Sequence, residues 1–448
     1  MSIEALRVAI SAETVDTVLL ALTDMQGRLQ GKRLYAPFFL DEVLAHGSEA
    51  CNYLLAVDVE MNTVSGYAIS GWEQGYGDFA MVPDLKTLRR VPWQPGTALV
   101  LADLAWLDGK PVAESPRQIL RRQLDLLEAE HGLVAYVGTE LEFVVHKESY
   151  EDAQRQHYQA LTPANGYNVD YSVLGTARVE PLLRRIRQEM AGAGLYPESA
   201  KGECNLGQHE IAFRYDRALT TADNHAVYKN GAKEIAAQEG CSITFMAKPN
   251  AREGNSCHVH FSLRTSRGEP VMSGADGALS QLGAHVLAGM LAATRDLSLF
   301  LAPNINSYKR FQPGSFAPTA LRWGRDNRTC ALRLVGHGPS LRVEHRVPGA
   351  DVNPYLAIAA LVAAARHGLS GKLELEPEFS ANAYADSSAP RVPATLREAL
   401  SAWRESAMVP EFFGSAVADH YARAAEVEIE AFDAAVTDWE LRRGYERL

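Results

Sequence analysis

The sequence is poor in cysteine and has no long apolar run. Its five cysteines are an odd number and include no C-x-x-C pair. Neither a disulfide framework nor a zinc ribbon is therefore expected, and a reducing compartment suits the chain. The most apolar stretch, LAIAALVAAA from Leu356, falls short of the roughly 18 residues that a membrane span requires.

A signal peptide and an excess of positive charge are also missing. The N-terminal stretch MSIEALRVAISAETVDTVLL has acidic residues among its apolar ones and no basic leader. The 55 acidic residues outnumber the 44 lysines and arginines, which gives a formal net charge of −11. This balance argues against nucleic acid or an anionic membrane as the main partner, although many cytosolic enzymes are acidic for solubility alone. We expect a cytoplasmic protein.

The length of 448 residues predicts two domains, because a single hydrophobic core rarely grows this large. Residues 15–24 and 25–34 read as two strands joined by a glycine-containing turn, whereas residues 64–84 read as an irregular loop. A helix begins near Ser115, where serine and proline precede apolar residues at helical spacing. We therefore place an N-terminal domain at 1–108 and a larger domain at 109–448.

The larger domain alternates predicted helices and strands. Apolar residues recur at helical spacing in segments 178–194, 224–240, 278–297 and 353–368. Strand-like segments are found at 133–145, 207–215, 242–248, 257–263 and 340–348. The expected fold class is α+β, with a mainly antiparallel sheet backed by helices.

Several strand-like segments carry ionisable residues two positions apart, so both side chains of a pair point to one face. These residues are Glu140 with Glu142, His258 with His260, and Glu344 with Arg346, while another segment adds Glu203 and Glu210. Two carboxylates about 6.5 Å apart repel by roughly 2.5 kcal/mol at an effective dielectric constant of about 20. One such pair, taken alone, usually marks a strand face that is exposed to solvent. Together they predict a site for two or three Mg²⁺ or Mn²⁺ ions, and the scarcity of thiols argues against zinc.

Six motifs stand in an order that resembles the glutamine synthetase superfamily, namely GTELEF, GQHE, CHVHFSL, RFQPGSFAP, WGRDNRT and VEHRVPGADVNPY. The resemblance covers the whole chain and is nearest to the bacterial branch of γ-glutamylpolyamine and γ-glutamylethanolamide synthetases. It implies a small N-terminal β-grasp-like domain, followed by a large catalytic domain with a curved antiparallel sheet backed by helices. It also implies a homododecamer of two stacked hexamers, in which neighbouring subunits share each active site.

The resemblance assigns roles to residues in and around these motifs. The implied ligands of the metal ion that binds the glutamate substrate are Glu142, Glu203 and Glu210. The implied ligands of the metal on the ATP phosphates are Glu140, His258 and Glu344. The residues implied to bind glutamate or lie beside it are Glu142, Gly254, His258, Arg310, Arg346 and Phe316. The two residues implied to act in catalysis are Arg310 and Arg328.

The resemblance also implies a nucleotide site. Tyr215 matches the aromatic residue that stacks on adenine, and the channel beside it is lined by Glu198, His260, Ser262 and Arg342. Arg328 and Arg333 match arginines that neutralise the transferring phosphoryl group. The alternatives are that these two arginines are ordinary surface residues and that Tyr215 belongs to the core. The chain has no G-x-x-x-x-G-K-[ST] motif, so metals and basic side chains would hold the nucleotide.

The chain departs from the ammonia-using enzymes at their P-G-Y-E-A-P flap, which here reads PGSFAP with Ser315 and Phe316. Phenylalanine has no charge to bind ammonium and accepts no proton. The N-G-S-G stretch before H-x-H reads EGNS at 253–256. The D-G-S-S latch, whose aspartate reaches the ammonium site of a neighbouring subunit, is missing, and Asp58 and Glu60 are the candidate replacements.

These features predict a ligase that activates the γ-carboxylate of glutamate with ATP and joins it to a primary amine, such as a polyamine or ethanolamine. The alternatives are a glutamine synthetase that uses ammonia, a catalytically silent nitrogen-sensing paralogue and an unrelated metal-binding module. Phe316 could also be a functionally neutral replacement. In that case another carboxylate would bind ammonium in place of the flap glutamate. The family's adenylylation tyrosine falls near Tyr384, but the flanking residues differ, so that modification is not expected.

Overall fold

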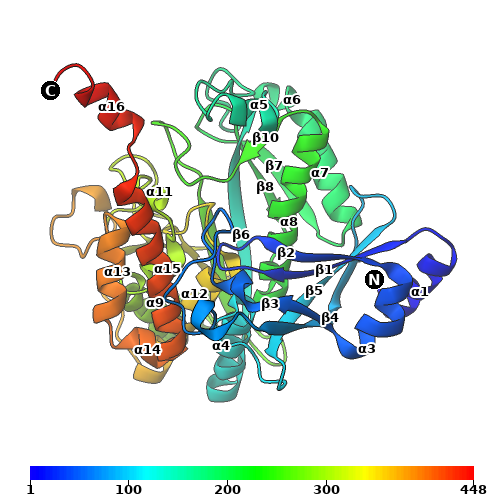
Figure 1. Cartoon of the computed structure of the whole chain (residues 1–448). Coiled ribbons are helices and arrows are strands. Elements are labelled where there is room, and N and C mark those ends of the chain that lie inside the picture. The colour runs from blue at the N-terminus through cyan, green and yellow to red at the C-terminus, as the bar shows by residue number, and fades with distance from the viewer.

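Two β-sheets organise the chain, which the computed structural model describes from Met1 to Leu448 (Figure 1). The N-terminal sheet has the strand order β2-β1-β5-β4-β3. Its strands are β1 Thr17–Thr23, β2 Leu29–Tyr35, β3 Ser48–Cys51, β4 Asp78–Arg90 and β5 Thr97–Trp106. β1 and β2 form the predicted antiparallel hairpin, and β1 pairs with β5 in parallel. The predicted domain boundary lies between the end of β5 and the helix that begins at Pro116.

The prediction of an irregular loop over residues 64–84 is wrong at its C-terminal end. Residues Asp78–Asp84 belong to β4, which pairs with both β3 and β5. Phe79 and Met81 are fully buried and alternate with more exposed neighbours, which is the pattern of a half-buried strand. Gly75 and Gly77 directly precede the short alternation of buried and exposed residues in this strand. Because glycines are typical of loops, they favour the loop prediction.

The second sheet has nine strands in the order β12-β13-β14-β11-β6-β8-β7, with β9 and β10 also paired to β6. Its strands are β6 Leu133–His146, β7 Pro197–Gly202, β8 Gln208–Phe213, β9 Asp216–Arg217, β10 Ser242–Thr244, β11 Cys257–Thr265, β12 Trp323–Arg325, β13 Leu332–Val335 and β14 Arg342–His345. Only β12 and β13 pair in parallel. The predicted α+β class with a mainly antiparallel sheet is confirmed, although β10 ends four residues before the predicted strand 242–248 does.

Helices cover this sheet and fill the space beside it (Figure 1). The longer ones are α4 Pro116–His131, α7 Glu180–Gly192, α8 Ala218–Gln238, α9 Gln281–Thr294, α12 Pro354–Gly371, α13 Leu396–Glu405 and α15 Ser415–Ala434. The shorter ones are α1 Ile3–Ser11, α2 Ala36–Phe38, α3 Leu44–His46, α5 Tyr150–Arg155, α6 Val173–Ala177, α10 Ser298–Leu301, α11 Ile305–Tyr308, α14 Met408–Phe413 and α16 Asp438–Gly444. All five helices predicted from the sequence are present.

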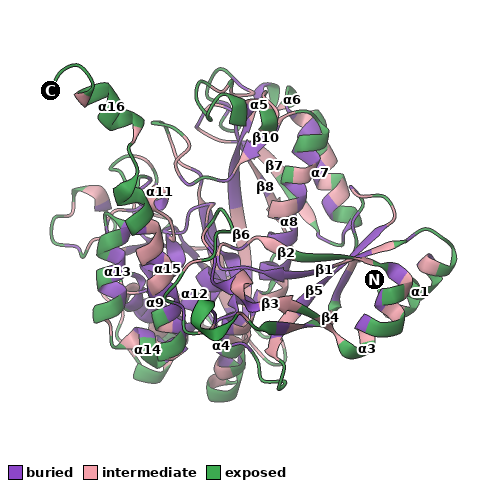
Figure 2. Ribbon diagram, in the orientation of Figure 1, coloured by how far each residue is buried: buried purple, intermediate pink, exposed green.

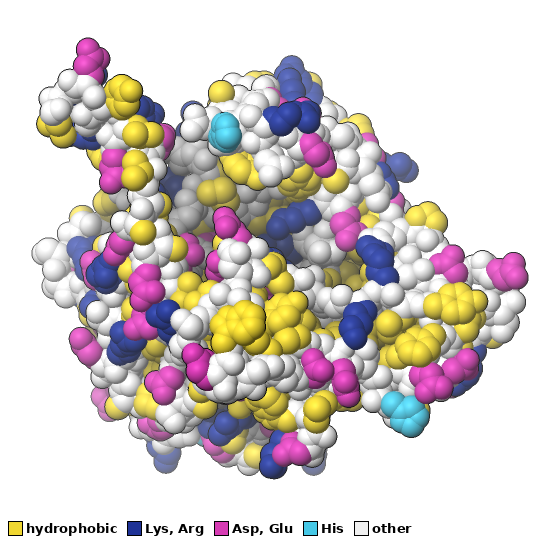
Figure 3. Space-filling model, viewed as in Figure 1, with side chains coloured by type: hydrophobic (Ala, Val, Ile, Leu, Met, Phe, Trp, Pro, Cys, Tyr) yellow, Lys and Arg dark blue, Asp and Glu magenta, His cyan; other side chains and the backbone are white.

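The helix α12 lies at the centre of the helical layer. It is apolar on all sides and buried from Pro354 to Ala365, as Figure 2 shows in purple. It approaches α9 closely, because a Cβ atom added to Gly368 would lie only 2.0 Å from the carbonyl oxygen of His285. None of the helices combines the length and apolar character needed to cross a bilayer. On the face seen in Figure 3, acidic and basic side chains are interspersed.

A buried arginine joins the two sheets through the helices between them. Arg117 on α4 is 2% exposed and donates hydrogen bonds to Asp84 and Asp103 of the N-terminal sheet and to Asp223 of α8. The N–O distances to Asp84 and Asp223 are 2.8 and 2.9 Å. Three carboxylates around one guanidinium offset its desolvation and hold the N-terminal sheet against the larger domain.

Replacement of this arginine tests that connection. Arg117→Met leaves Asp223 buried without its cation, so we expect the free energy of unfolding to fall by about 3 to 5 kcal/mol. Arg121→Met is the matched control, because Arg121 also contacts Asp84 and Asp103 but is more exposed, and its loss should cost about 1 kcal/mol or less. Denaturant-induced unfolding measures both. Equal effects would contradict the buried role of Arg117.

Candidate active site

The register of the central strands brings the predicted ligands side by side. On β6, Glu140 stands opposite His258 of β11, and Glu142 stands opposite Glu210 of β8. Residues directly opposite each other on neighbouring strands share a face of the sheet. Because Glu140 and Glu142 are two residues apart, all four side chains point to the same side of the sheet.

The next strands extend this row of ionisable side chains. Glu344 of β14 stands opposite His260 of β11 on one side and opposite Arg333 of β13 on the other. Glu344 is 1% exposed, and it forms ion pairs with Arg333, at 2.7 Å, and with Arg346. Glutamates, histidines and arginines from five neighbouring strands therefore meet on one face.

A cavity of about 320 Å³ lies over this face. It is lined by all six residues predicted as metal ligands, Glu140, Glu142, Glu203, Glu210, His258 and Glu344. It is also lined by the predicted substrate and phosphate residues Gly254, Phe316, Arg328, Arg333 and Arg346. Arg328, which is exposed, and Arg333, which is half-buried, both line this cavity.

The carboxylates of this cavity strongly perturb one another. Burial and the neighbouring Glu203 raise the pKa of Glu142 from 4.5 to about 8. Burial, together with Glu140 and Glu142, raises the pKa of Glu210 well above its ordinary value. Burial also raises the pKa of Glu203, against the opposing effect of Lys201. Without an added cation, these three carboxylates are held in an environment that favours protons.

The imidazole of His258 is held in its neutral form. Burial and the nearby Arg346 lower the pKa of His258 to about 4, so its imidazole is uncharged at neutral pH. Burial alone would raise the pKa of Glu140, but hydrogen bonds with His258 and His260 outweigh it and hold that pKa low. The Nδ1 atom of His258 lies 3.3 Å from oxygens of both Glu140 and Glu344, while its buried Nε2 atom has no hydrogen-bond partner.

These donors fit divalent metal ions. Carboxylate oxygens of Glu142, Glu203 and Glu210 lie within 4.8 Å of one another, and so do ligand atoms of Glu140, His260 and Glu344. Oxygen-rich groups with one imidazole suit Mg²⁺ or Mn²⁺. The compact second group contains His260 instead of the predicted His258. His260 already contacts Arg342 at 3.0 Å and Glu140 at 2.8 Å, whereas the Nδ1 atom of His258 lies 3.3 Å from oxygens of both Glu140 and Glu344.

One predicted residue, Arg310, does not line the cavity. Its guanidinium is 2% exposed and donates to the backbone carbonyls of Val347, at 2.6 Å, and of Arg346, at 2.9 Å. Arg310 therefore supports the strand end that carries Arg346. Arg346 itself does face the cavity, where it donates to Glu344 and to the backbone carbonyl of Phe316.

The cavity also contains residues that the motifs did not single out. Lys201 forms ion pairs with Glu203 and, at 3.2 Å, with Asp170, and its ammonium lies 4.2 Å from the ring centre of Tyr171. The buried Gln208 amide donates to Glu142 at 3.0 Å and so orients a predicted metal ligand. Lys201 stands two residues before Glu203, a spacing that could have revealed it. Asp170 and Tyr171 lie in a segment without any motif.

A second cavity of about 320 Å³ adjoins the first and shares Glu140 with it. The predicted nucleotide-channel residues Glu198, Tyr215, His260, Ser262 and Arg342 all line it. Tyr215 is 50% exposed, so the alternative that it belongs to the core is wrong. Arg264 and Tyr136, which sequence analysis missed, complete the aromatic end. The Arg264 guanidinium lies 4.7 Å from the Tyr136 ring and donates to the Tyr215 hydroxyl at 2.9 Å.

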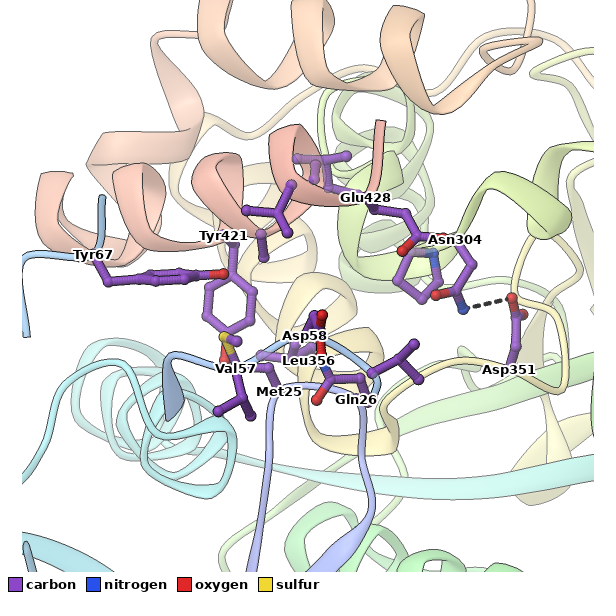
Figure 4. A pocket seen from close by; sticks show the side chains of 16 residues that line it. Met25, Gln26, Val57, Asp58, Tyr67, Asn304, Asp351, Leu356, Tyr421 and Glu428 are labelled. Carbon is purple, nitrogen blue, oxygen red and sulfur yellow. Dashed lines mark hydrogen bonds between the residues drawn. The ribbon is translucent and has the colours of Figure 1, made fainter. Parts of the chain in front are cut away.

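The two candidate residues of the N-terminal domain lie elsewhere. Asp58 lines a separate cavity of about 90 Å³ between an N-terminal loop and α15, where it faces the same space as Glu428 (Figure 4). Asp58 accepts hydrogen bonds from the backbone of Glu60, at 2.9 Å, and of Asn62, at 2.8 Å. Within one chain, neither Asp58 nor Glu60 lines the carboxylate cavity. Their contribution to a neighbouring subunit's site stays a prediction.

The raised pKa of Glu142 predicts a link between pH and stability. A carboxyl group whose pKa rises on folding from 4.5 to about 8 stabilises the fold below pH 4.5 and loses that contribution as the pH rises to 8. In chelator, we therefore expect the thermal midpoint to fall over this range more steeply for the native chain than for Glu142→Gln. Saturating Mg²⁺ should abolish the difference in slope. Parallel slopes for both proteins in chelator would contradict the strained carboxylate cluster.

Comparison with known proteins agrees with this geometry. Residues 113–444 match the family model "Glutamine synthetase, catalytic domain". The chain is 64% identical over 448 residues to γ-glutamylethanolamide synthetase GlnA4 of Streptomyces coelicolor, which covers 100% of this chain and 96% of the relative. It is 39% identical over 440 residues to the glutamate–isopropylamine ligase of a Pseudomonas species, covering 97% of this chain and 96% of the relative.

The fold is likewise shared with a solved structure. The structure titled GmaS/ADP complex superimposes with a TM-score of 0.86 at 26% identity, covering 98% of this chain and 99% of that one. The motif order, the family match and these relatives confirm the resemblance drawn from the sequence. The chain belongs to the glutamine synthetase family.

Proposed function

We propose that this protein joins the γ-carboxylate of glutamate to ethanolamine or a similar small primary amine. The enzyme is an ATP-dependent glutamate–amine ligase that works with divalent metal ions, as expected for its family. Phe316 supports this choice of acceptor most directly, because its side chain lines the carboxylate cavity. The ammonia-using members of the family have a flap glutamate at this position. The names of the Streptomyces and Pseudomonas relatives, an ethanolamide synthetase and an isopropylamine ligase, support the same class of acceptor.

The first chemical step would convert the unreactive γ-carboxylate into an acyl phosphate. The γ-phosphoryl group of ATP passes to a carboxylate oxygen of glutamate, and ADP leaves. Arg328 and Arg333 line the cavity and would offset the charge of the transferring group. We infer two or three bound divalent ions, held by Glu142, Glu203 and Glu210 and by Glu140, His258 and Glu344. These ions would supply charge neutralisation and substrate orientation.

The second step needs an uncharged amine next to the acyl phosphate. The amine nitrogen attacks the γ-carbonyl carbon, the C–N bond forms, the amine loses a proton and inorganic phosphate leaves. Phe316 is 55% exposed and can neither hold an ammonium ion by charge nor accept its proton. Its ring can instead cover the carbon chain of an alkylamine, which favours a larger acceptor over ammonia.

The site bears on the three alternative functions that the sequence left open. A catalytically silent paralogue would be expected to have a degraded metal site, yet all six predicted ligands gather in one cavity with the arginines. An unrelated metal-binding module does not explain those arginines. Ammonia use stays open to experiment, because Lys201, Asp170 and Glu203 place further charged groups in the same cavity.

We also propose that the protein forms a dodecamer of two stacked hexamers in the cytoplasm. The C-terminal helix α16 extends away from the rest of the chain in Figure 1 and leaves apolar side chains exposed. Its neighbourhood includes Val436, Trp439, Leu441, Tyr445 and Leu448, with exposed fractions from 51 to 101%. Such a segment suits burial against another copy of the chain. The five free cysteines suit a reducing compartment.

An amine scan tests the acceptor directly. With glutamate, ATP and Mg²⁺, we expect phosphate release with ethanolamine to exceed that with ammonium at equal concentration. Phe316→Glu should lower the preference for ethanolamine over ammonium by about tenfold or more, because it replaces an apolar wall with a carboxylate. Phe316→Leu is the matched control that keeps the wall apolar. Efficient turnover with ammonium and none with amines would overturn the proposed acceptor.

Mass photometry tests the assembly. We expect a species of about twelve times the 49.0 kDa chain mass. Deletion of residues 436–448 should remove the apolar contact and yield smaller rings. A monomer that is fully active at nanomolar concentration would contradict an active site shared between subunits.

A further inference from the structure

The segment 312–317 forms the Phe316 side of the carboxylate cavity, and only its last residue, Ala317, is packed into the core. Gln312, Pro313 and Gly314 are exposed, and Phe316 itself is 55% exposed. Phe316 also has a φ of +60°, a left-handed conformation that a phenylalanine keeps only when its surroundings impose it. Hydrogen bonds to this segment must therefore decide where the Phe316 ring lies.

Three side chains make those hydrogen bonds. The Ser315 hydroxyl donates within the turn, to the carbonyls of Gln312 at 2.6 Å and Arg310 at 3.1 Å. Arg346 donates to the Phe316 carbonyl at 3.1 Å, but its other amino group is engaged with Glu344. The Tyr384 hydroxyl donates to the Ala317 carbonyl, also at 3.1 Å. Tyr384 is thus the one contact that reaches the segment from outside the cavity.

The support of Tyr384 is itself well anchored. Tyr384 lies in the 3-10 turn Ala383–Ala385, which begins with Asn382 as its N-cap. Ala383 is fully buried in a small cluster with Ala320 and Cys330, and its backbone N–H donates to Thr329 at 3.0 Å. Burial raises the pKa of the Tyr384 hydroxyl, which keeps its proton available for donation. A rigid turn therefore presents this hydroxyl to the flap segment.

We propose that Tyr384 is a positioning residue for the acceptor amine. Its hydroxyl fixes the Ala317 end of the segment, Arg346 fixes the Phe316 carbonyl, and the two bonds together hold the Phe316 ring as a wall of the cavity. The segment is a prebuilt wall that selects an alkylamine by shape. This inference rests on the proposed function, because it assumes that an amine binds against Phe316.

Removal of the single hydroxyl tests the inference. Tyr384→Phe should raise the KM for ethanolamine about three- to tenfold, which corresponds to one net hydrogen bond, while kcat and the KM values for glutamate and ATP change less than about twofold. Tyr150→Phe is the matched control, because its hydroxyl also donates to a backbone carbonyl, that of Ile243 at 3.0 Å, but lies outside both cavities. Tyr150→Phe should leave every KM unchanged.

A double substitution separates positioning from a general structural effect. If Tyr384 acts through the aromatic wall, Tyr384→Phe should have little further effect on the KM for ethanolamine in a Phe316→Ala background. Fully additive effects would overturn the inference, and so would an unchanged KM for ethanolamine in Tyr384→Phe. Amine turnover by the native enzyme, measured first, keeps the two proposals apart. Its absence overturns both, whereas amine turnover with an unaffected Tyr384→Phe overturns only the role of Tyr384.

Discussion

The mutual repulsion of buried carboxylates is the constraint on which the rest of the structure depends. Strand register places Glu140, Glu142, Glu210 and Glu344 on one face of the sheet, and Glu203, which directly follows β7, lines the same cavity. Without cations the ionised forms of Glu142 and Glu210 oppose folding, as their raised pKa values indicate, whereas the neighbouring histidines and Arg346 hold the pKa values of Glu140 and Glu344 low. The fold tolerates it because a large apolar core and the helices around α12 fix the strands. The stability contributed by this core and these helices thus maintains a site whose carboxylates require bound cations.

Arginines lie against this acidic face of the sheet. Arg333 and Arg346 both contact Glu344, so the charges that would meet phosphate and carboxylate groups are also those that balance a metal ligand. Arg346 extends the connection to the backbone of Phe316, and Tyr384 supports the same segment from the other side. A short chain of hydrogen bonds therefore joins Glu344 to the segment that carries Phe316.

Local pattern predicts the components of this site, while their assembly depends on long-range contacts. The i, i+2 pairs of β6, β11 and β14 can be read from the sequence because a strand has a fixed period of two. The register that sets Glu140 opposite His258 follows from loop lengths and packing, which leave no local signature. The same limit explains Arg310, predicted at the substrate but turned toward backbone carbonyls, and Lys201, which no motif marked. β4 was obscured because its alternation is short and follows glycines.

Anomalous diffraction from crystals soaked in Mn²⁺ tests the central claim most directly. The account predicts one peak among the carboxylates of Glu142, Glu203 and Glu210, and another beside Glu140, Glu344 and the Nδ1 atom of His258. Glu142→Gln crystals should lose or weaken the first peak and keep the second. A cavity without metal peaks at saturating Mn²⁺, or ions bound only on the outer surface, would contradict the claim that divalent cations hold these carboxylates together.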